Sequence, residues 1–489
     1  MRQTRSVHHG SQVRAAVGLA LVLVVAGCSP GGPAPAPSGP SPSVSSPSSE
    51  PAPTATPTPS ATPRKATYQM PLALVVHPTR AAADVGVSAA RRVVARGATR
   101  WSAIDQSGGR MRVVSFEDRS ARTVLRQVRA SRNVLGIVPA DAVDARVRVL
   151  TVGGRHPLRD PKAYPLEVES DRPVPKVTTM TVVGDIMVAR RVGQAIAGDP
   201  RRPFRPLAKR LAGADITVGN LESTLSTDGS PTQGGDSFGA RPHVLRGLDF
   251  AGFDLVSLAN NHVGDYGDRA MRQTFARLRA AGLDYVGAGR TLAEARRPVV
   301  ITRAGVRVGF LGTESIGETP AAGRSRAGTN RLNMPPRTGP LDRDALRRIA
   351  GDIRRLKRQV DVVVVLPHWG TQYTHRAEAS QRTAARAFAA AGADLVLGGH
   401  PHWVQGWEHM GSTVVVHSLG NFIFDMDFQV KTREGIFVEV VLWDGQVKAV
   451  EPVPYTIDET FTPRLARGTG AASILGDVWA NSRGPYARP

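Results

Sequence analysis

One unit recurs in the second half of this 489-residue chain and limits how the chain can fold. A helical stretch leads through an aspartate into a run of β-branched apolar residues, and a polar cluster follows at once. The clearest copies lie at 207–222, 245–262, 341–370 and 382–402, and a fifth apolar strand at 179–183 opens the series. Apolar strands that alternate with helices predict an α/β fold with a sheet covered on both faces.

The polar clusters after these strands predict one functional rim. Functional side chains of such sheets gather just past the carboxyl ends of the strands. His400 and His402 are two residues apart, so on an extended segment both rings would point to the same side. The residues collected at the rim are two carboxylates, an asparagine and four histidines: Asp185, Glu222, Asn261, His262, His368, His400 and His402.

Carboxylates and neutral imidazoles together favour a divalent transition metal such as Zn, Mn or Fe. Each residue alone has a simpler explanation, because a single histidine after a strand is typical of a capping or surface residue, and Asp185 could cap a helix. The coincidence at successive strand ends favours a metal site. Asp265 follows His262 by three residues and either orients that histidine or stabilises the first turn of a helix expected at 266–281.

Six motifs in this region resemble those of the CapA family, whose members are linked to synthesis or export of poly-γ-glutamate capsule. The motifs occur in order over about 177–460. We therefore expect a CapA domain at 177–462 and a C-terminal tail at 463–489, which from about Gly468 is Gly- and Ala-rich at first and is expected to be poorly ordered. The motifs are Gly184-Asp185-Ile186-Met187, Asn220-Leu221-Glu222, Ala259-Asn260-Asn261-His262, His368-Trp369-Gly370, Gly399-His400-Pro401-His402 and Ser418-Leu419-Gly420-Asn421-Phe422.

The CapA domain is similar in turn to calcineurin-like metallophosphoesterases, which implies a metallophosphoesterase-like α/β sandwich with its metal site between sheets. The resemblance implies that His262 is the catalytic acid, and Asp265 is grouped with it as the residue that would orient the histidine. Asn421 is expected to make only structural loop contacts. Met187 stands where phosphoesterases usually carry a histidine, which leaves open whether one or two metals bind and whether the site is catalytic. The implied metal ligands are Asp185, Glu222, Asn261, His368, His400 and His402.

The implied function is a metal-dependent hydrolase acting in synthesis or export of poly-γ-glutamate or a related envelope polymer. The alternative is a non-catalytic, membrane-tethered scaffold or an anionic-polymer-binding subunit of a synthase or export complex. A net charge of +22 favours binding of an anionic polymer. The excess of 56 Arg over 7 Lys is, however, also typical of proteins from GC-rich genomes. The sequence has no recognition-helix or stacking motif, and we expect no nucleic-acid partner.

The N-terminus predicts an extracytoplasmic protein anchored to the cell membrane by lipid. Basic residues precede a twelve-residue apolar run at 15–26, which is typical of a signal peptide and too short to span a bilayer. The run ends in Val25-Ala26-Gly27-Cys28, which resembles a bacterial lipobox, and Cys28 is the only cysteine, so no disulfide can form within the chain. We expect a lipoprotein signal peptide at 1–28. Residues 29–66 hold 12 of the 37 prolines and predict a disordered Pro/Ser/Ala-rich stalk.

A smaller α/β domain is expected at 67–173, with strands at 72–76 and 134–138 and a helix at 88–95. Parts of this segment weakly resemble one lobe of a phosphate-type periplasmic binding protein. The length leaves room for one lobe only, so an accessory or docking domain is an equally good interpretation. The sequence assigns no site residues to it.

Overall fold

The computed structural model of the chain describes residues 66–488. The predicted signal peptide, the lipidation site Cys28 and nearly all of the predicted stalk lie outside the described residues and stay predictions. Within the described part, no helix combines the length and apolar character that crossing a membrane requires.

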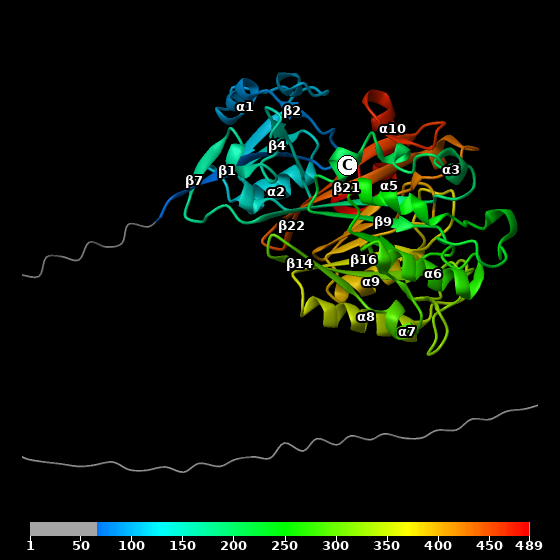
Figure 1. Cartoon of the computed structure of the whole chain (residues 1–489). Helices are drawn as coiled ribbons and strands as arrows, with labels where there is room; N and C mark the ends of the chain where they lie inside the picture. The colour runs from blue at the N-terminus through cyan, green and yellow to red at the C-terminus, as the bar shows by residue number, and fades with distance from the viewer. Residues whose placement is uncertain (1–65, 489) are drawn as a thin grey trace, which may run out of the picture. The chain divides into compact units, whose positions relative to one another are not determined.

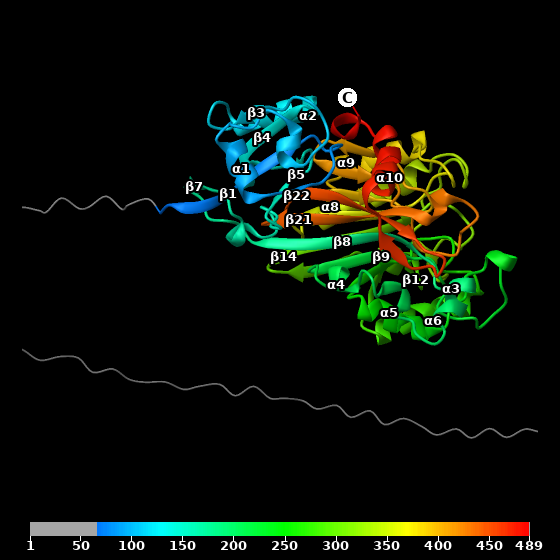
Figure 2. The same cartoon turned by 90° about the horizontal axis from the view of Figure 1, so that it is seen from above.

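Two sheets form the centre of the larger domain (Figure 1). The first has the strand order β11-β10-β9-β8-β21-β22-β23, with β20 beside β8. Strands β8 to β11 run parallel to one another, and β21 joins β8 antiparallel. Figure 2 shows β8, β21 and β22 side by side. The strands are β8 (Val177–Ile186), β9 (Ile216–Leu221), β10 (Leu255–Ser257), β11 (Asp284–Val286), β20 (Asn421–Ile423), β21 (Glu434–Trp443), β22 (Gln446–Ile457) and β23 (Pro463–Leu465).

The second sheet has the order β13-β14-β16-β17-β19-β18. Strands β14, β16, β17 and β19 are parallel, and hairpin partners close both edges. A separate two-stranded pair joins β12 (Ala288–Gly289) to β15 (Gly328–Thr329). The strands of the second sheet are β13 (Val299–Arg303), β14 (Val306–Glu314), β16 (Val362–His368), β17 (Leu395–Leu397), β18 (Trp407–Met410) and β19 (Thr413–Val416).

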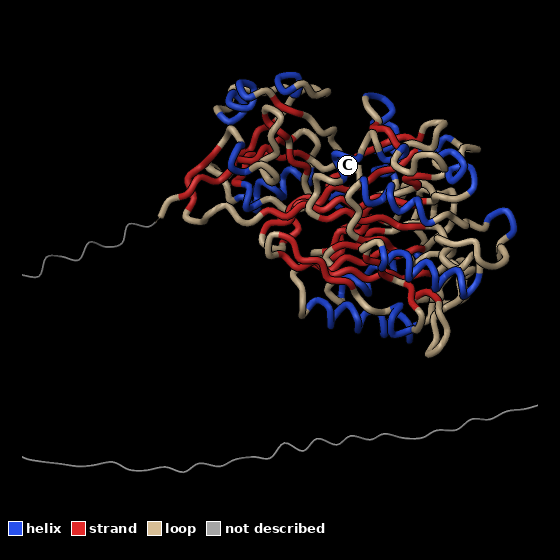
Figure 3. Tube along the Cα trace, in the orientation of Figure 1, coloured by secondary structure: helices blue, strands red, loops and turns tan. Residues whose placement is uncertain are grey.

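The two sheets face each other across one apolar core. Val182 of β8 and Val438 of β21 belong to the same buried cluster as Phe310 of β14 and Val364 of β16. Helices cover the outer faces, as the helices outside the strands in Figure 3 show. The first sheet is covered by α3 (Arg190–Ala195), α4 (Ala208–Leu211), α5 (Leu245–Phe250) and α6 (Gly267–Ala280), and the second by α8 (Arg343–Lys357) and α9 (Ala379–Ala390); α7 (Leu292–Ala295) lies beside β12 and β15.

The predicted α/β sandwich with a smaller N-terminal α/β domain is confirmed, but the expectation of one sheet covered on both faces is wrong. Strands β8, β9 and β10 lie in the first sheet, whereas β16 and β17 lie in the second. Every residue of β16 is buried, because helices cover one face and the other sheet covers the opposite face. A continuous apolar strand reveals that both faces are covered, not what covers them.

The smaller domain carries its own sheet, ordered β3-β4-β1-β5, with β7 also paired to β1. The predicted strands and helix at 72–76, 134–138 and 88–95 correspond to β1, β4 and α1. Strands β1 and β4 are antiparallel, and β3 lies parallel to β4. The elements are β1 (Tyr68–Val76), β2 (Asp84–Val85), α1 (Val87–Val94), β3 (Arg112–Ser115), α2 (Ala121–Ala130), β4 (Val134–Pro139), β5 (Arg148–Val149), β6 (Thr151–Val152) and β7 (Glu167–Ser170).

Strands β21 and β22 of the larger domain complete the core of the smaller one. Val441 and Trp443 belong to the same buried cluster as Val75 and Leu158. The indole Nε1 of Trp443 donates to the carbonyl of Leu158 at 2.7 Å. The described residues, 66–488, therefore belong to one compact unit, in which the smaller domain is fixed by apolar packing.

The expectation of a poorly ordered tail is wrong. Strand β23 extends the first sheet, and α10 (Gly468–Ala480) follows it. Trp479 of α10 packs against Trp407, with ring centroids 5.5 Å apart, and against Tyr486. The glycines and alanines at the start of the helix gave no sign of this, because the aromatic anchors lie further along the chain.

Candidate metal centre

Three predicted ligands meet where strands from both sheets end. Asp185 is the penultimate residue of β8, Glu222 directly follows β9, and His368 is the last residue of β16. One ligand atom from each residue lies within 4.8 Å of the others, and all three side chains are buried. The carboxyl ends of the two sheets therefore meet at one rim.

Asn220, which the sequence analysis gave no role, sits at the centre of this group. Its Nδ2 lies 2.8 Å from Asp185 Oδ1, 3.1 Å from Glu222 Oε1 and 3.1 Å from His368 Nδ1. An amide nitrogen carries two hydrogens and cannot donate to three acceptors at once. The acceptor atoms around Asn220 therefore outnumber the hydrogens available to them. Their free lone pairs form a set of ligands suited to a cation.

Two orphaned atoms point to the same conclusion. Glu222 Oε2 and His400 Nε2 are buried and have no hydrogen-bond partner within residues 66–488. The rings of His400 and His368 lie 4.9 Å apart, and the backbone N–H of His400 donates to Asp185 Oδ2 at 3.0 Å. Buried polar atoms without partners are rare, and a bound cation would satisfy both.

The electrostatics of the group also fit a cation. Burial raises the pKa of Asp185 to about 6, and burial together with the neighbouring Asp185 raises the pKa of Glu222 well above its usual range. Burial lowers the pKa of His368 and of His400 well below 6.5, so both imidazoles are neutral at pH 7 and keep a lone pair for a metal. Without a cation, the two carboxylates repel each other in a site that water does not reach.

Asn261 links this group to His262. Its Oδ1 accepts from His368 Nε2 at 2.9 Å, and its Nδ2 lies 2.9 Å from His262 Nε2. The amide thus presents oxygen to the carboxylate–histidine group and nitrogen to His262. This orientation is compatible with the predicted role of Asn261 as a ligand through oxygen.

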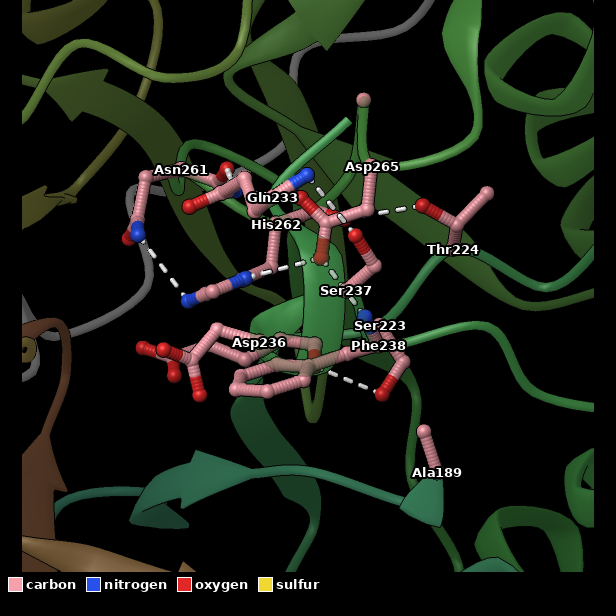
Figure 4. Close-up of polar contacts among 12 residues, drawn as sticks. Ala189, Ser223, Thr224, Gln233, Asp236, Ser237, Phe238, Asn261, His262 and Asp265 are labelled. Carbon is pink, nitrogen blue, oxygen red and sulfur yellow. Dashed lines mark hydrogen bonds and ion pairs between the residues drawn. The ribbon is translucent and has the colours of Figure 1, made fainter. Parts of the chain in front are cut away.

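His262 is held rigidly by the loops around it (Figure 4). Its Nδ1 lies 2.9 Å from Asp265 Oδ2, and its ring stacks on Phe238 at 3.8 Å between centroids. Asp265 is 1% exposed and also accepts from the backbone N–H of Phe238 at 2.7 Å. Of the two readings of Asp265, orientation of His262 is the one its contacts support, because the carboxylate fixes a proton on Nδ1 and leaves Nε2 for chemistry.

His402 is oriented by a residue that was expected to be only structural. Asn421 donates its Nδ2 to the carbonyl of Thr432 at 3.0 Å, so its Oδ1 faces His402 Nδ1, 2.8 Å away. His402 therefore carries its proton on Nδ1 and keeps a lone pair on Nε2. Assigning Asn421 to loop contacts alone is wrong, since it fixes the tautomer of a predicted ligand.

His400 and His402 reach the same cavity, although not for the expected reason. Their backbone φ values are +94° and +58°, so the segment is not extended. Both rings nevertheless line one cavity of about 570 Å³ together with Asn261 and His262. His402 lies outside the tight Asp185–Glu222–His368 group, and it would have to serve a second position.

The lining of the cavity also carries paired charges. Arg190 bridges Asp236 at 3.0 Å and Asp425, and its guanidinium lies 4.6 Å from the ring centroid of Phe238. Arg337 and Glu318 form a further pair on the rim. Arg190 begins α3, whereas Asp425, Glu318 and Arg337 lie outside the helices and strands, and no pattern in the sequence marked any of these residues.

Met187 contributes nothing to the polar group. It is fully buried among apolar side chains, and its Sδ accepts from the backbone N–H of Ala189 at 3.1 Å. The resemblance implies a histidine at this position. The side chain found there is part of the apolar core, so the cavity lacks one expected donor.

The fold and the site together define an α/β sandwich protein with a buried carboxylate–imidazole group able to hold a metal ion. Residues 179–426 match the family described as bacterial capsule synthesis protein PGA_cap, and the chain belongs to that family. The resemblance to CapA proteins is thereby confirmed.

Named relatives agree with this assignment. The chain is 32% identical to the capsule biosynthesis protein CapA of Bacillus anthracis, over 58% of this chain and 68% of that protein. It is 30% identical to the PGA biosynthesis protein CapA of Bacillus subtilis, over 58% and 72%. A crystal structure of a hypothetical protein from Thermus thermophilus is similar at a TM-score of 0.36 with 17% identity, over 57% of this chain and 99% of that one; a score this low supports no inference about function.

Proposed function

We propose that this protein is a metal-dependent hydrolase that acts in the synthesis or export of poly-γ-glutamate or a related envelope polymer. The observation that carries the proposal is the buried Asp185–Glu222–His368 group, with ligand atoms within 4.8 Å of one another. Two relatives are named as proteins of capsule biosynthesis and of PGA biosynthesis, and these names support poly-γ-glutamate or a related polymer as the product that this protein helps to make or export. The lipobox-like segment ending at Cys28 supports a lipid anchor and an extracytoplasmic location.

The donor set assigns roles in holding the metal. Asp185, Glu222, His368 and His400 would hold one divalent ion, and Asn261 with His402 would contribute to that position or to a second. Bound there, Mn, Fe or Zn would supply positive charge that polarises a phosphoryl or carbonyl oxygen and lowers the pKa of water. The residues present fit such an ion, because Glu222 Oε2 and His400 Nε2 are buried and have no hydrogen-bond partner among the described residues.

His262 would act on the leaving group. Asp265 accepts a hydrogen bond from Nδ1–H and would stabilise the imidazolium form, whose Nε2–H faces the cavity and would deliver its proton to an oxygen that departs there. Phe238 holds the ring plane by stacking. Removal of the imidazole would abolish proton transfer and leave the buried carboxylates in place.

The test uses the full chain with its metal site loaded in turn with Mn, Fe or Zn, and a phosphomonoester and a phosphodiester reporter. We expect turnover that chelator removes. His262→Ala should lose at least about 100-fold in kcat while it retains metal, because general acid catalysis typically contributes that much. His243→Ala, a histidine outside the cavity, is the matched control and should be unchanged. Absence of turnover with every metal would refute the catalytic role.

A non-catalytic scaffold or polymer-binding subunit is the second candidate, and Met187 favours it. The core position of that side chain removes one expected donor, which weakens a two-metal mechanism. The scaffold predicts salt-sensitive binding of poly-γ-glutamate that is unaffected in a His262→Ala, His400→Ala double variant. The hydrolase predicts that the same variant loses turnover.

A further inference from the structure

A second cavity, larger than the one at the metal centre, lies between the smaller domain and the elements β22 and α10. Its volume is about 920 Å³. One wall comes from the loops after β1 and after the 3-10 turn η1 (Trp101–Ile104) and from β5, and the other from β22 and the α10 region. None of its lining residues lines the cavity of the metal centre.

The charge in this cavity is strongly one-sided. Arg80, Arg132, Arg148 and Arg488 line it, against a single carboxylate, Asp105. Arginines elsewhere in the described residues, such as Arg210 and Arg296, pair directly with carboxylates. The four arginines of the cavity have no carboxylate oxygen within 4 Å among the described residues.

Arg80 is held in a fixed geometry by uncharged partners. Its Nε donates to the carbonyl of Arg132 at 2.5 Å, and its Nη1 donates to Gln106 Oε1 at 3.0 Å and to the carbonyl of Ser107 at 3.1 Å. The guanidinium lies flat over Trp101, 3.3 Å from the ring centroid. Nη2 has no hydrogen-bond partner in the part of the chain that the structure describes, and the side chain is only 7% exposed. A donor is thus pre-oriented toward the cavity.

Arg148 is a second buried cation without a direct partner. It is 6% exposed, and its side chain makes no hydrogen bond or ion pair with any described residue. Glu451 acts on it electrostatically, but that carboxylate lies instead 3.4 Å from His156 and 3.3 Å from Arg159. A buried guanidinium that lacks a paired anion is costly. Burial lowers the pKa of both arginines, that of Arg80 to about 10.

The facing wall is apolar except for Arg488, whose guanidinium lies near Gly476 of α10. Pro452, Pro454, Leu475 and Trp479 line it. A cavity with cationic donors on one wall and apolar side chains on the other fits a molecule that carries an oxyanion at one end and carbon at the other. The volume is ample for more than an inorganic ion, since typical small-molecule sites span about 300–1,000 Å³.

We propose that this cavity binds a small organic oxyanion, with its phosphate or carboxylate group between Arg80, Arg132 and Arg148 and its apolar part against Leu475 and Trp479. Planar guanidinium groups match either oxyanion in a two-pronged arrangement. The smaller domain is then a ligand-sensing element fixed to the larger domain. This inference does not depend on hydrolysis at the metal centre.

The test measures binding of inorganic phosphate, phenyl phosphate and benzoate to the full chain by titration calorimetry, in chelator so that the metal centre does not contribute. We expect phenyl phosphate or benzoate to bind with a Kd of about 1 mM or tighter, and the better of the two identifies the oxyanion. Phenyl phosphate should bind more tightly than inorganic phosphate, because only the former reaches the apolar wall.

Two variants connect binding to the cavity. Arg132→Glu changes an exposed side chain and should weaken binding at least about tenfold, as expected for loss of a charge-assisted contact. Arg148→Gln should do the same, and melting temperature monitors its folding. Arg122→Glu on the exposed face of α2 is the matched control with the same change of charge. Absence of binding by all three probes, or equal binding in Arg132→Glu and the control, would overturn the proposal.

Discussion

Asp185 offers the sharpest test of the metal centre, because its burial makes a stability prediction with a definite sign. The difference between a folded-state pKa of about 6 and the ordinary value of 3.8 corresponds to about 3 kcal/mol. The pKa is raised on folding, so this contribution to stability is intact below about pH 4 and lost as the pH rises to about 6. Above that range, the metal-free protein keeps a buried carboxylate without compensation.

Asp185→Asn replaces the carboxylate by a neutral amide of the same shape. In chelator at pH 8, we expect the variant to be more stable than the wild type by up to about 3 kcal/mol, or roughly 5 °C in Tm for a cooperative unit of this size. At pH 4 the two proteins should melt together, because the wild-type carboxyl is then protonated. The charge of Asp185 also raises the pKa of Glu222. Removing that charge in Asp185→Asn therefore makes ionised Glu222 less costly and adds to the gain in stability.

Metal should reverse this order. At a metal concentration of 1,000 times Kd, the wild type gains about 4.1 kcal/mol, which exceeds its deficit of about 3 kcal/mol, whereas Asp185→Asn gains much less. Asp361→Asn is a control of opposite sign, because the backbone N–H of Arg307 lowers the pKa of Asp361, and its amide variant should lose stability at pH 8. The reasoning is refuted if Asp185→Asn in chelator melts below the wild type at pH 8 while Asp361→Asn behaves as expected.

Three further outcomes follow from other contacts. Asn421→Ala should weaken metal binding about 10–100-fold with little change in Tm, because His402 loses the group that fixes its tautomer; unchanged affinity would contradict that role. Trp443→Ala should cost about 3–5 kcal/mol, seen in thermal melting, since it empties the core shared by the two domains and leaves the carbonyl of Leu158 unpaired. Glu439→Gln should destabilise above about pH 5 but not below about pH 3, because two arginines lower the pKa of this carboxyl; a pH-independent loss would contradict the ionic explanation.

Local sequence rules were enough to choose the residues of the rim. Asp185, Glu222 and His368 were predicted because each follows an apolar strand, and the structure brings exactly these side chains within reach of a single ion. Asn220 was visible in the Asn-Leu-Glu motif but received no role, because nothing in the sequence shows that its amide faces three acceptors. Phe238 had no pattern at all, since its contact with His262 is made by an irregular loop.

The lack of information about long-range contacts also explains two predictions that were wrong. The tail was expected to be poorly ordered from its small residues, yet Trp479 anchors α10 against Trp407. Asn421 was assigned to loop contacts, yet it faces His402 across 19 residues of chain. Both contacts depend on where distant segments are folded, and composition does not carry that information.

The sequence by itself determined the strands and helices, the burial of the strands on both faces, the family, and the set of polar residues at the strand ends. These properties depend on neighbours within a few residues, through side-chain periodicity and backbone preference. Only the tertiary structure decided that the strands divide between two facing sheets, and that His400 meets Asp185 across 215 residues of chain. It also decided that the smaller domain shares its core with β21 and β22 and encloses an arginine-lined cavity. Packing of apolar surfaces far apart in the chain sets these contacts, and no local pattern encodes which surface meets which.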